Sequence, residues 1–140
     1  MAIGKQSKAN MAKVRQEVYA RDSERCIVAG STWAMLHPCF GGMTLQHSVK
    51  RGMGSSAKWD GADFLRVMCA GHNALAESDA AFAKACIRAG WAVPRWVAET
   101  TPINRVPVLY ADGWHLLDGG KRFAISDNTA IDLQLEIYGD

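Results

Sequence analysis

Two histidines stand where their side chains could take part in hydrolytic chemistry. His47 ends an apolar run and is followed by Lys50 and Arg51 in a glycine-rich stretch, while His72 follows Cys69 in a Cys-x-x-His-Asn sequence. Neutral imidazole accepts protons near neutral pH and also binds divalent metal ions. Guanidinium and ammonium groups bind phosphate oxygens. These residue types suit a metal-assisted hydrolysis at phosphorus.

The spacing of these residues resembles the HNH, or ββα-metal, endonuclease family, in a form that phages encode. The resemblance rests on Leu45-Gln46-His47, on Arg51-Gly52-Met53-Gly54 and on Cys69-Ala70-Gly71-His72-Asn73, within roughly residues 15–80. It implies an α+β fold with a ββα-metal core, an N-terminal helix and a C-terminal β-hairpin appendage. It also implies a metal-dependent DNA endonuclease whose products carry 5′-phosphate and 3′-hydroxyl ends.

The resemblance assigns a role to each of the residues that carry it. His47 would be the general base, and Arg51 would stabilise charge on the scissile phosphate. His72 would bind one divalent ion, Mg²⁺, Mn²⁺, Ni²⁺ or Zn²⁺, with Gln46 as a further ligand. Gln46 stands where the family usually has Asp or His, and its neutral amide oxygen binds a hard cation more weakly than a carboxylate does. The predicted DNA contacts are Lys50, Arg51 and Arg15.

Three further polar residues are candidates for supporting roles. The asparagine that gives the family its middle letter is absent, and Asp63 lies near its expected position, where it could bond the loop that carries the base. Asn73 and Glu77 fall on the first turns of the helix predicted after His72, where they could assist metal binding. The alternative for each is an ordinary exposed position on the protein surface.

The cysteines depart most from the family pattern. Many relatives bind a structural zinc through two Cys-x-x-Cys pairs, whereas Cys26 and Cys69 each stand without the second cysteine of such a pair. Cys39 could supply a third thiolate, but three scattered cysteines are a weaker indication of zinc than two intact pairs. In an alternative interpretation, these three cysteines and His72 form one structural zinc site, which excludes His72 from catalysis. Cys86 is expected to be a buried hydrophobic residue.

Length and composition predict a single domain. A chain of 140 residues with 49% hydrophobic residues can bury one sizeable core, which we place at about residues 15–96, with a β-rich extension at about 102–140. The formal charge of +2 does not by itself indicate a nucleic-acid-binding protein, although basic residues gather early in the chain. No apolar run approaches the roughly 20 residues that span a bilayer, and the N-terminus lacks the apolar segment of a signal peptide.

We therefore expect no membrane association and a cytoplasmic location, which is the host cytoplasm if a phage encodes the chain. DNA is the expected partner, together with phage packaging or recombination proteins. The competing interpretation is a degenerate HNH domain that has kept the fold and lost turnover, and serves as a DNA-binding or protein-binding module.

Periodicity and turn residues predict the elements that position these groups. A helix is expected over residues 7–22, a short extended piece over 26–28, and a hairpin of strands 43–47 and 64–68 around a loop at 51–61. Residues 73–89 should form one helix that ends at Gly90. Strands 108–110 and 114–117 flank Asp112-Gly113, residues 121–125 could add a third strand, and 129–140 is either a strand or a frayed terminus.

Overall fold

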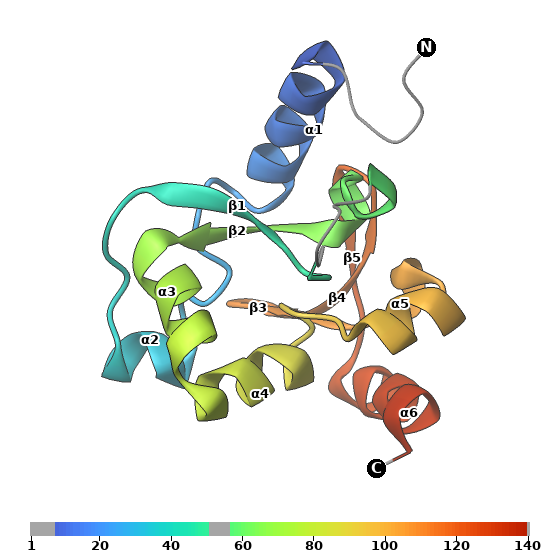
Figure 1. The fold of residues 1–140 in the computed structure, drawn as a ribbon. Helices are drawn as coiled ribbons and strands as arrows, with labels where there is room; N and C mark the ends of the chain where they lie inside the picture. The colour runs from blue at the N-terminus through green and yellow to red at the C-terminus, as the bar shows by residue number, and fades with distance from the viewer. Residues whose placement is uncertain (1–7, 51–56, 140) are drawn as a thin grey trace.

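The computed structural model describes residues 8–50 and 57–139. Within these residues the chain is α+β, with six α-helices and two antiparallel sheets (Figure 1). The first sheet pairs β1 (Met43–His47) with β2 (Leu65–Cys69), and the second has the order β3 (Val108–Tyr110), β4 (Gly113–Asp118), β5 (Lys121–Ala124). No helix of the described part of the chain is long and apolar enough to cross a membrane.

The first sheet is a hairpin that leads directly into a helix. Met43 lies opposite Cys69 and His47 lies opposite Leu65, so the two strands run antiparallel over five residues each. Every residue of β2 is buried, and α3 (Ala70–Ser78) begins at the next residue. The predicted strand, strand, helix order is therefore present.

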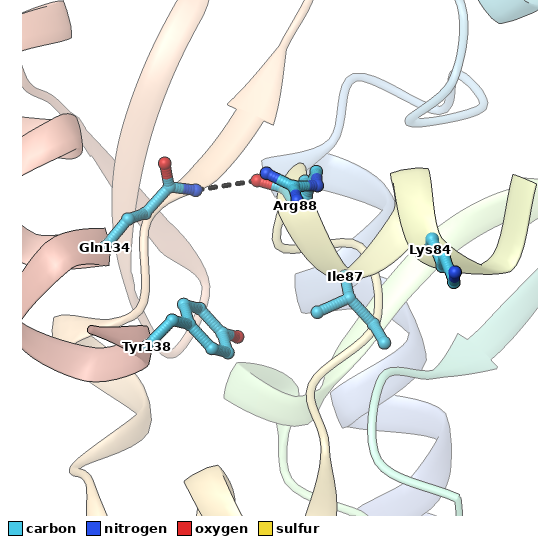
Figure 2. A pocket seen from close by; sticks show the side chains of 5 residues that line it. All are labelled: Lys84, Ile87, Arg88, Gln134 and Tyr138. Carbon is cyan, nitrogen blue, oxygen red and sulfur yellow. Dashed lines mark hydrogen bonds between the residues drawn. The ribbon is translucent and has the colours of Figure 1, made fainter. Parts of the chain in front are cut away.

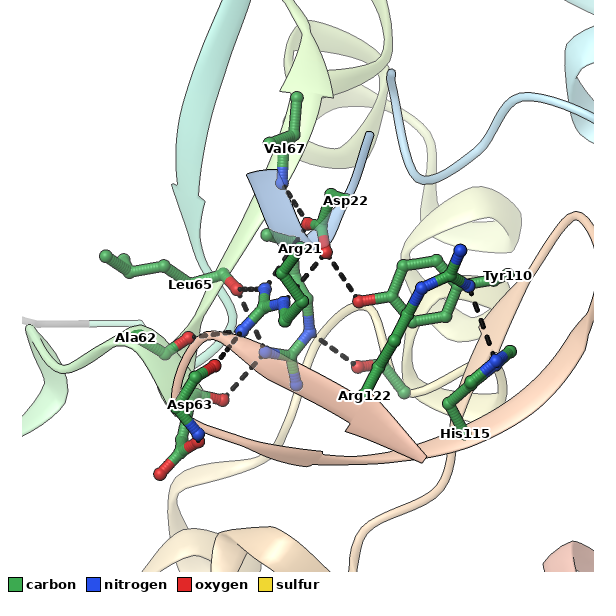
Figure 3. A network of polar contacts seen from close by, with 12 residues as sticks. Arg21, Asp22, Ala62, Asp63, Leu65, Val67, Tyr110, His115 and Arg122 are labelled. Carbon is green, nitrogen blue, oxygen red and sulfur yellow. Dashed lines mark hydrogen bonds and ion pairs between the residues drawn. The ribbon is translucent and has the colours of Figure 1, made fainter. Parts of the chain in front are cut away.

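A buried polar network fastens helix α1 (Lys8–Arg21) to both sheets (Figure 3). The Asp22 carboxylate accepts a hydrogen bond from the backbone N–H of Val67 in β2 at 3.1 Å and one from the Tyr110 hydroxyl in β3 at 2.6 Å. Arg21 pairs with Asp22 at 2.8 Å and donates to the carbonyl of Leu65 at 2.6 Å. Burial and the Asp22 charge raise the pKa of Tyr110, so its hydroxyl stays a donor.

Arg66 is a second buried arginine at the centre of this network. It is fully buried, and its guanidinium donates to the carbonyls of Asp63 at 2.7 Å and Gly90 at 3.2 Å. Burial and the neighbouring Arg21 lower its pKa to about 10. Carbonyl partners replace some of the lost water, so Arg66 links the 3₁₀ turn before β2 to the turn at Gly90, after helix α4 (Ala80–Arg88).

The main apolar core lies between β2, helix α4 (Ala80–Arg88) and the second sheet. Phe82 from α4 is fully buried and packs against Trp91 and, in an edge contact, against Trp33. Leu117 of β4 is buried in the same cluster. Cys86 belongs to it at 2% exposure, which confirms the prediction of a buried thiol.

The helix predicted over 73–89 is two helices. Helix α3 ends at Ser78 and α4 begins at Ala80, because Asp79 between them has an extended backbone. Its carboxylate accepts a hydrogen bond from the N–H of Phe82 at 2.9 Å, as an N-cap does. Since Asp is a good cap and a poor helix former, a cap inside the alanine-rich run was the signal for this break.

The C-terminal segment is also not as predicted, since it forms helix α6 (Asp127–Tyr138) rather than a strand or a frayed end. The Ser126 hydroxyl caps its first turn by accepting from the N–H of Thr129 at 3.1 Å, and Gly139 ends it at φ 80°. The apolar alternation misled the prediction because Ile131 and Leu135 are exposed by about half. The predicted strands β3 and β4 and the third strand β5 are confirmed.

Shorter elements complete the chain, and the sequence did not predict them. They are α2 (Thr32–Leu36), α5 (Arg95–Thr100) and the 3₁₀ turns Ala57–Trp59, Ala62–Phe64 and Ile103–Arg105. The stretch predicted as extended at 26–28 is a series of turns. The N-terminal helix predicted over 7–22 is confirmed as Lys8–Arg21.

Candidate functional site

Three cysteines and a histidine from separate segments meet at one end of the β1–β2 hairpin. Cys26 follows α1, Cys39 lies between α2 and β1, Cys69 ends β2, and His72 is in the first turn of α3. One ligand atom from each of the four residues lies within 4.8 Å of all the others. The Nδ1 atom of His72 is 3.6, 3.5 and 3.1 Å from the sulfurs of Cys26, Cys39 and Cys69. This group could hold a metal ion.

Backbone geometry brings the loop containing Cys39 against the start of α3. The N–H of Ala70 donates to the carbonyl of Gly42 at 2.9 Å, and the N–H of Gly71 donates to the carbonyl of Phe40 at 3.0 Å. A Cβ on Gly71 would lie 2.4 Å from the ring of Phe40, so only glycine permits this approach. The two hydrogen bonds and the glycine contact fix Cys39 beside Cys69.

The turn that carries Cys26 has a left-handed backbone at two consecutive non-glycine residues. Ser23 has φ 58° and Glu24 has φ 54°, and the N–H of Glu24 donates to the carbonyl of Tyr19 at 2.8 Å. L-residues adopt this conformation at a cost, which the surrounding contacts must offset. The turn ends α1 and directs the chain back to the cluster, where Cys26 is 4% exposed.

The environment of His72 fixes which ring nitrogen faces the cysteines. Its Nε2 lies 2.6 Å from the carbonyl oxygen of His37. A carbonyl only accepts, so Nε2 carries the proton and Nδ1 presents a lone pair to the three sulfurs. A ring N–H held by a carbonyl is the usual outer-shell arrangement of a metal-binding histidine. His72 is 1% exposed, so both ring nitrogens are committed within the cluster.

The thiols of the cluster differ in acidity. Burial opposes ionisation of Cys69, but N–H groups of His72 and Phe40 donate to its sulfur and hold the pKa below its ordinary value. Burial raises the pKa of Cys26, and burial together with the charge of Cys26 raises the pKa of Cys39 to about 12. Several adjacent thiolates repel one another, so a bound cation is what would allow all three to ionise.

His47 lies at the opposite end of the same hairpin. Cys69 pairs with Met43, four residues before His47 along β1, so the antiparallel register separates His47 from the cluster by about 13 Å of strand. The predicted shared site of His47, Gln46 and His72 is therefore not assembled in the described residues. Gln46 lies opposite Arg66 in the register of the two strands.

His47 has a partner of its own. Its Nε2 lies 2.9 Å from Oδ1 of Asp60, in the segment between the two 3₁₀ turns that precede β2. The side chain of His47 is 27% exposed, whereas that of Asp60 is 8% exposed. An ionised carboxylate accepts from Nε2–H and leaves Nδ1 as the free lone pair, so His47 can accept a proton from a water molecule on its exposed side.

The other predicted site residues lie apart from this pair. Asp63 accepts a hydrogen bond from the N–H of Gly119 and ties β2 to the second sheet, rather than bonding the described part of the base loop. Asn73 is half-buried and Glu77 exposed on α3, and Arg15 is exposed on α1. Lys50 is exposed next to Val49, and its carbonyl accepts from Arg95 at 2.8 Å. Arg51 lies outside the described residues.

Asp60 and the His37 carbonyl are the contributors that the sequence did not reveal. Asp60 stands in Trp59-Asp60-Gly61, just before the returning strand, where the family's middle asparagine would be sought. The sequence pattern pointed to Asp63 as the residue that bonds the base loop, although Asp60 is equally acidic and also lies close to β2. A backbone carbonyl such as that of His37 leaves no signal in a sequence.

Comparisons of the chain with protein-family models, with curated proteins and with solved structures found no significant match.

Proposed function

We propose that the chain is an HNH-like nucleic-acid hydrolase in which His47 is the general base, and that the cluster of Cys26, Cys39, Cys69 and His72 is its structural zinc centre. The observation that carries the first part is the His47–Asp60 pair at 2.9 Å, at the end of β1. The second part rests on the four converging ligand atoms.

The cluster has the donor set and the spacing that tetrahedral zinc takes. Sulfur at about 2.3 Å and nitrogen at about 2.0 Å from one ion lie about 3.5 Å from each other. The three measured separations of 3.1, 3.5 and 3.6 Å between His72 Nδ1 and the sulfurs agree with this value. Four protein ligands leave no open position for substrate, which is typical of a structural site rather than a catalytic one.

A zinc ion there would join three segments that are far apart in the sequence. The turn after α1, the loop before β1 and the start of α3 would be cross-linked at one point. Binding of this kind contributes directly to folding, because the unfolded chain does not hold the four ligands together. In this proposal His72 binds the structural zinc ion, and it is no longer a ligand of a catalytic ion.

The proposed chemistry at His47 is proton transfer from water. With Nε2–H donated to Asp60, Nδ1 accepts one proton from a water molecule as its oxygen attacks the phosphorus of a phosphodiester. The bond from phosphorus to one bridging oxygen breaks, and solvent supplies the proton that this oxygen takes up. The cationic side chain of Lys50, three residues along, is suited to holding the phosphate charge. The resemblance further implies a divalent ion, which would add Lewis-acid stabilisation of that charge.

Nicking of supercoiled plasmid with Mg²⁺, Mn²⁺, Ni²⁺ or Zn²⁺ tests both parts of the proposal. His47→Ala should abolish nicking, Asp60→Asn should reduce it less, and His37→Ala, which removes an exposed imidazole, should leave it unchanged. His72→Cys is the decisive variant because four cysteines also bind zinc. We expect it to keep zinc and to nick as wild type does. Loss of nicking with zinc retained would return His72 to the catalytic site.

The alternative function is a binding module without turnover. It is favoured by one observation: the described residues contain no second group of three His, Cys, Asp or Glu side chains that could hold a metal ion. This module would bind DNA or protein, and it would nick no plasmid in the presence of Mg²⁺, Mn²⁺, Ni²⁺ or Zn²⁺.

A further inference from the structure

A hollow lies between helices α4 and α6, on the far side of α4 from the cysteine cluster. Two pairs of side chains spaced four residues apart face each other across it, Lys84 and Arg88 from α4 and Gln134 and Tyr138 from α6, with Ile87 between them (Figure 2). Its volume is about 330 Å³. The Gln134 side chain donates to the carbonyl of Arg88 at 2.6 Å and fixes one wall.

The hydroxyl of Tyr138 has no hydrogen-bond partner among the residues that the structure describes. Its oxygen is buried, and burial raises the pKa of the phenol so that it keeps its proton. Buried polar atoms without a partner are few in folded proteins, and each one that occurs asks for an explanation. A ligand that accepts a hydrogen bond here would supply the missing partner.

A second hollow, of about 450 Å³, shares Ile87 with the first and lies beside the end of β1. It is lined by Ser48, the residue after His47, and by Lys50 and Arg95. The buried Ser48 hydroxyl also lacks a hydrogen-bond partner in the described structure. Ile87 therefore lines both hollows. Each hollow is also lined by two cationic residues and by one residue whose buried hydroxyl has no hydrogen-bond partner among the described residues.

We propose that the two hollows form one channel that holds the sugar–phosphate backbone of a nucleic-acid strand beside the end of β1; this rests on the proposed function above. Among the described residues that line the channel, Lys84, Arg88, Lys50 and Arg95 are cationic and none is acidic. A nucleic-acid strand carries a negative charge at every phosphate, so cationic residues along both hollows suit it better than they suit a single small anion. Contacts to phosphate position a strand without reading its sequence.

The test is binding of a fluorescein-labelled 20-base DNA, single-stranded and duplex, measured by anisotropy over a range of salt concentrations without added divalent ions. The channel variant is Lys84→Gln with Arg88→Gln. The matched control is Lys13→Gln with Lys121→Gln, which removes two exposed positive charges elsewhere. The channel variant should bind at least tenfold more weakly, and the slope of log K against log salt should fall by about 1.4 to 1.8 for two lost phosphate contacts. The control should change by less than twofold.

Tyr138→Phe separates a hydroxyl that binds from one that is merely buried. We expect it to weaken DNA binding several-fold while the protein folds as well as wild type or better, because an unpartnered buried hydroxyl destabilises the protein without ligand. Unchanged binding by Tyr138→Phe would remove the hydroxyl from the channel.

The outcomes distinguish this inference from the proposed function because binding is measured without cleavage. If wild type nicks plasmid but the channel variant binds DNA as tightly as its control, the channel proposal fails alone. If wild type nicks nothing but the channel variant binds weakly with the reduced slope, the hydrolase proposal fails and the channel stands. A wild type that binds no DNA overturns the channel.

Discussion

The two ends of the β1–β2 hairpin differ in how far their polar groups are committed. At the end that begins β1, His72 is 1% exposed and both ring nitrogens face partners within the protein. At the other end, the side chain of His47 is 27% exposed, and within the described residues Nε2 alone has a partner, Asp60. A closed, fully satisfied cluster suits a structural role, whereas an imidazole with one free nitrogen suits proton transfer. Two histidines that look like one site in the sequence therefore lie at two separate places with different partners, and we propose a different role for each.

The largest expected effect is loss of a ligand at the closed end. Cys69→Ala leaves three ligands and removes the cap of α3, so the zinc should dissociate and the domain should unfold near room temperature. Structural zinc contributes about 10 kcal/mol or more to the folding of small zinc domains. Zinc content by mass spectrometry and thermal unfolding by circular dichroism would check this. A Cys69→Ala protein that melts as wild type does would show that the cysteine cluster has no structural role.

The next effect is expected at the open end and should concern activity alone. His47→Ala removes the proposed general base, and such a group typically contributes about 10² to 10⁴-fold in rate. Because His47 is partly exposed, the zinc content and melting temperature of the His47→Ala protein should stay near those of wild type. The measurement pairs nicking rates with melting curves. If His47→Ala lost its zinc, the two ends would not be independent.

A smaller effect tests what holds the second sheet to the hairpin. Tyr110→Phe removes the hydrogen bond to the buried Asp22 and should lower the free energy of unfolding by about 1 to 3 kcal/mol. Tyr19→Phe is the matched control, since its hydroxyl makes an exposed bond to the carbonyl of Met43 at 3.2 Å, and it should cost little. Urea unfolding of both variants would measure the difference. Equal midpoints would show that the Tyr110–Asp22 bond does not hold the second sheet to the hairpin.

The smallest effect concerns the cysteines. Burial raises the pKa of Cys86 to about 12, so below that pH its thiol is neutral and unreactive in the folded state. With zinc bound, iodoacetamide at pH 8 should modify none of the four cysteines. After chelation opens the cluster at a temperature where the rest of the fold persists, Cys69 should react first, because its pKa is held below the ordinary value, and Cys86 should not react. Peptide mass spectrometry would assign the sites, and early labelling of Cys86 would contradict its place in the core.

The stability of the folded protein should depend on pH through Cys86, because its pKa is higher in the folded chain than in the unfolded chain. Its raised pKa means that the folded chain holds a proton that the unfolded chain releases as pH rises through about 9. The contribution of Cys86 to stability is therefore fully present below pH 9 and is lost between there and about 12. Cys86→Ala should flatten the loss of stability with pH in this window.

The sequence predicted those elements whose signals are local. The hairpins around β1 and around Asp112-Gly113 follow from alternating apolar residues and turn glycines, and both are confirmed. The break at Asp79 and helix α6 were missed because capping residues outweighed apolar pattern in each case. Local caps are visible in a sequence, but their strength relative to a neighbouring pattern is not.

The candidate site was predictable only in part, because its geometry depends on register. The metal group of Cys26, Cys39, Cys69 and His72 was weighed as an alternative, and the structure brings these four together. In an antiparallel hairpin, a residue that follows the second strand lies near the beginning of the first, so His72 could have been separated from His47 by this argument. The Asp60 contact depends on the fold of the loop between the strands, for which the sequence gives no measure.

The most direct test of the account is zinc K-edge absorption spectroscopy on the protein as purified, with His72→Cys as the comparison. The account predicts three sulfurs at about 2.3 Å and one nitrogen at about 2.0 Å in wild type, and four sulfurs in His72→Cys. A wild-type spectrum fitted by nitrogen and oxygen alone, or one that His72→Cys leaves unchanged, would place the ion outside the cysteine cluster and contradict the division of the hairpin into a structural and a chemical end.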